Sequence, residues 1–188
     1  MATANTRNLW RFTAAIIKDP DDLTAASPYG GTALGLIGDF VLAGENQHIE
    51  VQAEEFGGVT VDYVRTGEKA IITGVLRTWD DDAIGAIFPN TADGAGSNRK
   101  LLKGQVAGAG MTKPGKLASA NSFKLLVASD APDHNPSLLF YNAIPMMDTQ
   151  VRIASSPAAE AGLAVAFRAA PDADGKMYHM GLIEDMSL

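Results

Sequence analysis

The stretch HIEVQAEEFGGVTVDY, residues 48–63, determines the class of fold. Before its FGG turn, apolar Ile49, Val51 and Ala53 alternate with polar residues, and apolar residues after the turn alternate with polar ones in the same way. A period of two is the signature of a β-strand with one polar and one apolar face. The stretch therefore predicts a hairpin. Strict alternation gives it a polar face made of Glu50, Gln52, Glu54, Thr60 and Asp62.

Further strands are predicted on both sides of this hairpin. The segment TALGLIGDFVLA (32–43) precedes it, and AIITGVLRT (70–78) follows the turn RTGEK (65–69) as a strand covered on both faces. Four later strands are SFKLLVAS (122–129), SLLFYNAI (137–144), GLAVAFRAA (162–170) and KMYHMGLIE (176–184). The last two are joined by PDADG (171–175), which suits a hairpin turn with glycine at a positive φ. About eight strands predict a mainly β fold, either a sandwich or a closed barrel.

One α-helix is expected beside these strands, after the triplet Asp80, Asp81 and Asp82. Asp80 is suited to the N-cap, and the next two acids fall in the first turn, where the helix dipole favours negative charge. Ile84 and the residues after it have helical spacing, and Trp79 is placed to pack on Ile84 as a hydrophobic staple. Adjacent helical residues point in different directions, so the triplet is interpreted as a cap and not as a site for a cation.

The chain is interpreted as a single β-rich domain, residues 33–188, preceded by an N-terminal arm, residues 1–32. A long glycine-rich loop interrupts the domain at residues 89–121. This loop has five cations against the single acid Asp93, so it carries +4 while the rest of a chain of net charge −7 carries −11. The asymmetry favours a contact between the loop and an acidic surface of another subunit. The residues assigned to this contact are Arg99, Lys100, Lys103, Lys113 and Lys116.

The composition of the chain limits the classes of function that it can have. A net charge of −7 argues against a surface that coats nucleic acid, because phosphate binding requires a dense basic footprint. The chain has no cysteine, which excludes disulfides, thiolate metal sites and thiol nucleophiles. No stretch approaches the length of a membrane span, and the N-terminus lacks the apolar core of a secretory signal, so we expect a protein without a membrane segment.

No catalytic or cofactor-binding motif is found. PDADG lacks the third acid and the distal glutamate of a calcium loop, and GAGMTKPGK (108–116) does not have P-loop spacing. His48, His134 and His179 are far apart in the sequence, and no serine has the context of a nucleophile elbow. We therefore expect neither an enzyme nor a bound cofactor or metal.

Several segments, taken in order, resemble the major tail protein, or tail tube protein, of long-tailed bacteriophages and prophages. They are SPYGGTALGLIGDFVLA (27–43), VTVDYVRTGEKAIITGVLRTWDDDAIGAIFPN (59–90), NPSLLFYNAIP (135–145) and GLAVAFRAAPDADGKMYHMGLI (162–183). The resemblance covers most of the chain as an ordered pattern, without a single diagnostic motif. It implies a β-sandwich or barrel-like subunit with one flanking helix.

The resemblance also implies how such a subunit works. Six copies form a ring, rings stack into a hollow tube, and DNA leaves the virion through the tube. A β-hairpin of each copy contributes to a continuous inner barrel, and loops and the N-terminal arm link successive rings. The implied partners are other copies of the chain, a tape-measure protein, a tail terminator and baseplate or tip proteins. The implied location is the virion tail, assembled in the host cytoplasm.

Two hypotheses join the residues to this resemblance. Glu50, Gln52, Glu54, Thr60 and Asp62 face the lumen, where negative charge repels the phosphates of passing DNA. The five cations of loop 89–121 contact another subunit, between rings. Two alternatives remain open. One is a related tube component, such as a secretion-system tube subunit or a tail-completion protein, and the other is a small β-rich enzyme or ligand-binding module.

Overall fold

The computed structural model describes residues 14–35, 37–77, 119, 122–146 and 162–188. The described chain is mainly β, which confirms the predicted class, and eight strands form one antiparallel sheet. The only helical elements in these ranges are short 3-10 turns, among them Glu54–Phe56 and Ile183–Asp185. The strands are β1 Ala14–Lys18, β2 Thr32–Ala33, β3 Ile37–Ala53, β4 Val59–Leu76, β5 Phe123–Ser129, β6 Ser137–Met146, β7 Leu163–Ala170 and β8 Tyr178–Gly181.

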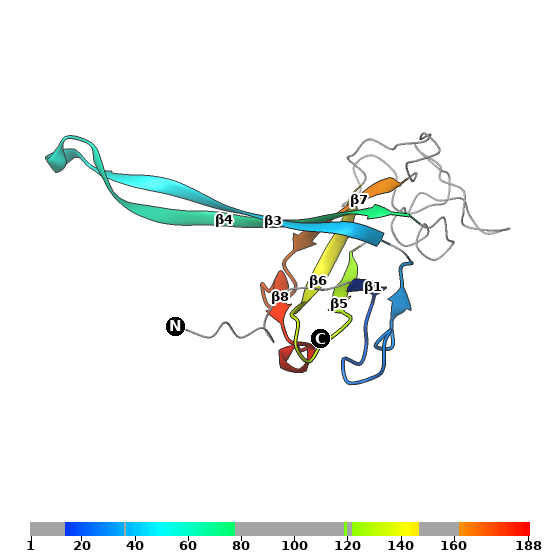
Figure 1. Ribbon diagram of the computed structural model, residues 1–188. Helices are drawn as coiled ribbons and strands as arrows, with labels where there is room; N and C mark the ends of the chain where they lie inside the picture. The colour runs from blue at the N-terminus through cyan, green and yellow to red at the C-terminus, as the bar shows by residue number, and fades with distance from the viewer. Residues whose placement is uncertain (1–13, 36, 78–118, 120–121, 147–161) are drawn as a thin grey trace, which may run out of the picture.

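The sheet is curved around its main core. Its strand order is β2-β1-β5-β6-β7-β4-β3, with β8 paired to β6 outside this path. Ile37 lies on β3 at one end of that order and Ile16 lies on β1, one strand from the other end, yet both belong to one buried cluster with Phe140 and Phe167. Phe123 packs edge-on against Phe167 in the same cluster, with ring centroids 6.0 Å apart. The strands other than the outer parts of β3 and β4 thus form a compact body around this cluster (Figure 1).

A second, smaller cluster covers the opposite face of the sheet. Leu126 and Leu139 of β5 and β6 are fully buried there, under Tyr29 from the β1–β2 connection and Met186 near the C-terminus. Because both faces of β5 and β6 are covered, these strands read as nearly continuous apolar runs. The sequence therefore located these two strands correctly.

The segment Ala14–Lys18 is a correction to the expected N-terminal arm. As β1 it lies inside the sheet between β2 and β5, and Ile16 and Ile17 are buried on its two faces. The apolar residues of this segment therefore belong to the two cores. Residues 1–13 lie outside the described residues.

PDADG is a turn, as predicted, but it does not close a hairpin. Gly175 has φ +82, and Asp172 Oδ1 accepts hydrogen bonds from the backbone N–H groups of Asp174 (2.9 Å) and Lys176 (2.7 Å). Yet β7 pairs with residues 142–146 of β6 and β8 with residues 137–140 of the same strand. The loop therefore connects two strands that pair with successive parts of β6 and not with each other. The prediction was wrong because local turn chemistry does not show which strand each flanking segment pairs with.

The segment RTGEK is also different from its prediction. It is not a turn, because β4 runs without interruption from Val59 to Leu76 and passes through it. Likewise β3 joins part of the predicted strand 32–43 to the strand of the hairpin. The last part of β4 is covered on both faces, as predicted. Ala70, Ile72 and Leu76 are buried on one face, and the side chains between them are half-buried on the other.

Two predicted elements fall outside the described residues. The helix capped by Asp80, with Asp81 and Asp82 in its first turn, lies in the range 78–118. The basic loop 89–121 lies there almost entirely, with only position 119 described. Both remain predictions.

Candidate assembly surface: the projecting hairpin

The most unusual feature of the molecule is the length of the β3–β4 hairpin. Its strands contain 17 and 18 residues, about three times the usual length of a strand. Beyond the body only β3 and β4 pair with each other, and Figure 1 shows the hairpin extending away from the compact sheet. We call its outer part, residues 44–69, the arm. At 3.3 Å per residue the arm reaches about 30 Å from the body.

A β-bulge in β3 lies within the body, shortly before the arm begins. The pairing shifts between Gly38, opposite Val75, and Val41, opposite Thr73, and Asp39 there has φ +56. Aspartate tolerates this left-handed conformation better than most residues. Arg77 donates a hydrogen bond to the Asp39 carboxylate at 2.8 Å, which ties the bulge to the end of β4. Phe40 packs against the main core beside it. These contacts fix the direction in which the arm leaves the body.

The root of the arm is also attached to β8. The Glu68 carboxylate accepts a long hydrogen bond, 3.5 Å, from the Tyr178 hydroxyl, and it forms an ion pair with Arg65 of the same strand. Tyr178 itself rests against the ring of Phe140, with centroids 5.8 Å apart. The root of the arm, at Glu68, thus contacts a side chain that packs against the core.

At the tip the chain reverses through a 3-10 turn followed by two glycines. Gly57 and Gly58 have φ +74 and +81, a conformation that is strained for residues with a Cβ atom. Their N–H groups donate to the carbonyls of Glu54 (3.1 Å) and Ala53 (3.2 Å). The FGG turn predicted from the sequence is therefore present, but Glu54 belongs to the turn and not to the strand face.

The two faces of the arm differ in polarity, although not as strict alternation predicted. Directly opposed residues of an antiparallel pair lie on the same face. The pairs His48–Arg65, Glu50–Tyr63 and Gln52–Thr60 form the polar face, and the Thr60 hydroxyl donates to Glu50 at 3.1 Å. The pairs Ile49–Val64, Val51–Asp62 and Ala53–Val59 form the apolar face.

Asp62 is therefore a correction, because it lies opposite Val51 on the apolar face and not beside Glu50. The pairing shifts between Val51 and Gln52, where Val61 has no directly opposed residue. An extra residue in one strand changes the phase of the alternation, which a period-two count through the segment does not detect. Glu50, Gln52 and Thr60 do share one face as predicted.

The arm exposes most of the large apolar side chains found at the surface of the described residues. Ile49 is 60% exposed, Val59 is 59% exposed and Val64 is 52% exposed, and among exposed large apolar residues only Met180 and Leu188 lie outside β3 and β4. A monomer gains nothing from holding apolar residues on an isolated two-stranded ribbon, which is marginally stable in water. These side chains indicate that another surface covers the arm.

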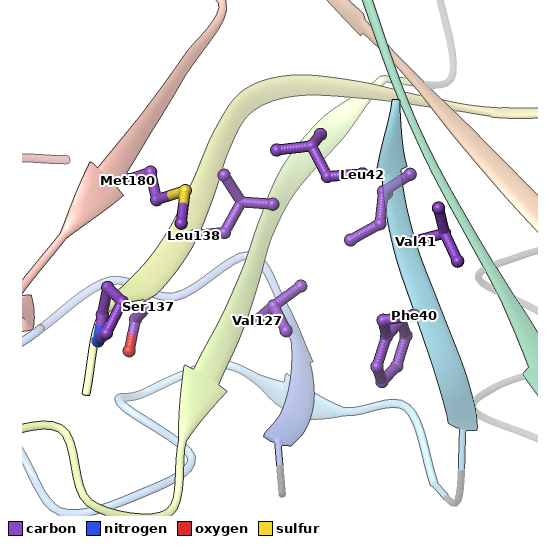
Figure 2. A pocket seen from close by; sticks show the side chains of 9 residues that line it. Phe40, Val41, Leu42, Val127, Ser137, Leu138 and Met180 are labelled. Carbon is purple, nitrogen blue, oxygen red and sulfur yellow. The ribbon is translucent and has the colours of Figure 1, made fainter. Parts of the chain in front are cut away.

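An apolar pocket lies where the arm meets the body. Its volume is about 580 Å³, and Figure 2 shows Phe40, Leu42, Val127, Leu138 and Met180 around it. Among the described residues its lining includes one hydroxyl, that of Ser137, which already accepts a hydrogen bond from the Ser129 backbone N–H at 3.1 Å. No ionisable side chain belongs to this described lining. The pocket suits apolar packing better than acid–base chemistry.

Two groups with shifted pKa values, Asp22 and Tyr29, belong to the β1–β2 connection and not to the arm. Hydrogen bonds from the side chain and backbone of Thr24 hold the pKa of Asp22 below its usual range. Burial, aided by the charge of Asp133, raises the pKa of the Tyr29 phenol. Both groups belong to a loop that covers the second core cluster, so the shifts have a structural origin.

The five cations predicted to contact another subunit are not placed by the structure. Arg99, Lys100, Lys103, Lys113 and Lys116 lie outside the described residues. Within the described ranges no group of three or more His, Asp or Glu side chains is placed to hold a metal ion. No helix in the same ranges has the length and apolar character needed to cross a membrane. Comparison with protein-family models and with curated proteins gives no match to this chain.

Proposed function

We propose that this chain is the major tail protein of a long-tailed bacteriophage or prophage, a structural subunit and not an enzyme. Six copies form a ring, and rings stack into the hollow tail tube that delivers DNA to the host. The observation that carries the proposal is the arm, a long two-stranded ribbon whose apolar side chains are exposed and whose two edges have no partner strand among the described residues. The quoted segments that resemble tail tube proteins contain much of this hairpin.

The arm has the properties that an inner tube wall requires. Antiparallel ribbons that join edge to edge around a ring remove every open edge, as in a closed barrel. The polar face then lines the lumen, and the apolar face packs outward on the bodies of the ring. In this arrangement Glu50, Gln52 and Thr60 face the DNA. Asp62 belongs to the outward face, and Glu54 lies at the tip.

The polar face is suited to the passage of DNA without adhesion. Arg65 is its only Lys or Arg among the residues of the three polar pairs, and its guanidinium is already paired with Glu68. A lumen with many unpaired cations would hold DNA through counterion release. The remaining partners follow from the proposal: a tape-measure protein inside the tube, a terminator and a tip complex at its ends, and the virion tail as its location. The basic loop 89–121 is proposed to link rings.

Co-sedimentation with duplex DNA tests this function. The unmodified protein should pellet as large assemblies and leave the DNA in the supernatant. The variant Gln52→Lys with Thr60→Lys adds two cations to each copy on the polar face, at directly opposed positions. Its assemblies should carry DNA into the pellet at low salt and release it as the salt concentration rises.

The matched control is Gln52→Asn with Thr60→Ser, which changes the same positions without adding charge. It should assemble and leave DNA in solution like the unmodified protein. If the lysine variant assembles but leaves the DNA in the supernatant at low salt, the polar face does not line the lumen. An unmodified protein that never pellets at any concentration would contradict the tube function itself.

A further inference from the structure

Among the described residues, neither edge of the arm is paired with a further strand, so both are available to another chain. Within the described residues β3 is the last strand of the sheet and pairs only with β4. The second edge of β4 pairs with β7 from Ile71 to Leu76, and no described strand pairs with it along the arm. Each edge presents backbone N–H and C=O groups that a strand of another copy can satisfy.

The two edge strands carry different charges. The arm part of β3 contains Glu45 and Glu50 and neither lysine nor arginine, whereas Arg65 and Lys69 lie on β4. Asp62 and Glu68 also belong to β4, so the arm part of this strand has two cations and two acids. The four residues are all exposed at the surface of the arm: Glu45, Glu50, Arg65 and Lys69. One edge strand is therefore acidic, and the other has the only cations of the arm.

We infer that charge selects which edges join: the β3 arm edge of one copy pairs with the β4 arm edge of the next, so that Glu45 and Glu50 approach Lys69 and Arg65 of the neighbour. This inference rests on the proposed function and specifies its interface. A symmetric pair of β3 edges would place glutamates near glutamates, and like charges across strands are destabilising. Pairing of unlike edges is heterologous and closes into a ring when the rotation allows it.

The geometry of a ring is compatible with this pairing. β3 and β4 of one copy are antiparallel, so identical copies arranged around an axis alternate in strand direction throughout. Every new contact is then antiparallel, like the sheet of the body. Lys69 already lies 3.8 Å from Glu45 of its own chain, and a second glutamate on its other side extends this pair across the interface. Each exposed ion pair contributes little affinity. The charges therefore determine which edges join, while backbone hydrogen bonds and apolar contacts stabilise the interface.

Two complementary charge variants test the inference. The first is Glu45→Lys with Glu50→Lys, and the second is Arg65→Glu with Lys69→Glu. Each variant alone has edges of like charge, and we expect its assembly to require at least about a tenfold higher concentration than the unmodified protein. An equimolar mixture should assemble near the unmodified concentration, in particles that contain both chains in equal amounts, as native mass spectrometry will measure.

The mixture contains its own control. Both variants lose the Glu45–Lys69 pair within the chain, and mixing does not restore it, so recovery can come only from contacts between copies. Variants that assemble alone at the unmodified concentration, or a mixture that does not recover, would overturn the edge assignment. If the unmodified protein still pellets in those cases, the tube function stands and only the edge pairing fails.

Disulfide formation gives a second test that does not depend on charge variants being folded. The natural sequence of the chain has no cysteine, so every disulfide that forms must join introduced cysteines. Copies with Gln47→Cys on β3 are mixed with copies that carry one cysteine on β4 at a position from 63 to 67, and the assembly is oxidised. A disulfide requires Cα atoms within about 7 Å, a condition that opposed residues of adjacent strands meet because those strands lie about 5 Å apart. Dimers that join β3 to β4 support the inference, whereas dimers of the Gln47→Cys copies alone would overturn it.

Discussion

Removal of the arm is expected to abolish assembly while the body keeps its fold. The variant replaces residues 45–69 by an Asn-Gly turn between Gly44 and Ala70, which are directly opposed in the hairpin. A two-residue Asn-Gly loop matches the twist of such a pair. The deleted side chains are largely exposed and the two core clusters contain none of them, so the circular dichroism spectrum and a cooperative thermal transition should be retained. Sedimentation velocity should show a monomer at every concentration at which the unmodified protein assembles.

The control for this deletion changes the arm without removing its edges. Glu54→Ser with Glu55→Ser alters two exposed acids in the turn at the tip and leaves the strands intact. It should assemble like the unmodified protein. If the arm-deleted chain, shown to be folded, also forms large particles, the body and not the arm would be the assembly element.

The second large effect is expected from charges on the apolar face. Ile49 and Val64 are directly opposed there, and both are more than half exposed. In a monomer the change Ile49→Asp with Val64→Asp should alter the free energy of unfolding by about 1 kcal/mol, the size of a cross-strand pair. In an assembly that buries this face, each carboxylate loses its hydration, which costs several kcal/mol. We therefore expect assembly to weaken on the order of a thousandfold or more, measured by sedimentation.

The matched control places the same two acids on the polar face. Gln52→Asp with Thr60→Asp also creates an opposed pair of carboxylates, and position 60 adjoins Glu50 as well, so the repulsion within the chain is at least as large as in the first variant. Because the polar face stays in water in the proposed tube, this variant should assemble within about tenfold of the unmodified protein. Equal loss of assembly in both variants would contradict the assignment of the two faces.

The fold class was predictable because burial leaves a clear record in the sequence. The apolar runs of β5 and β6 and the alternation at Ile49 and Val51 each indicated a strand at the correct place. The pairing of strands distant in the sequence was not predictable. Neither the place of β1 between β2 and β5 nor the division of one edge of β6 between β7 and β8 is visible in a local pattern.

The arm was predicted in part, and its length was missed for a physical reason. Side chains exposed on both faces follow no burial pattern, so Arg65–Lys69 has the polar, glycine-containing composition of a turn. The bulge at Val61 then moved Asp62 to the other face. The structure supplies what the sequence pattern does not: along the arm, the exposed apolar residues of 49–64 have no described element to pack against besides the two strands of the arm themselves. The proposed partner is another copy, which a single-chain pattern does not reveal.

Electron microscopy of the unmodified, purified protein shows directly whether this chain is a tube subunit. A tube subunit should give rings with a central hole seen end-on, with six-fold symmetry in class averages, and hollow filaments of stacked rings seen from the side. Particles without a central hole, symmetric dimers, or only monomers at concentrations up to the limit of solubility would contradict the account.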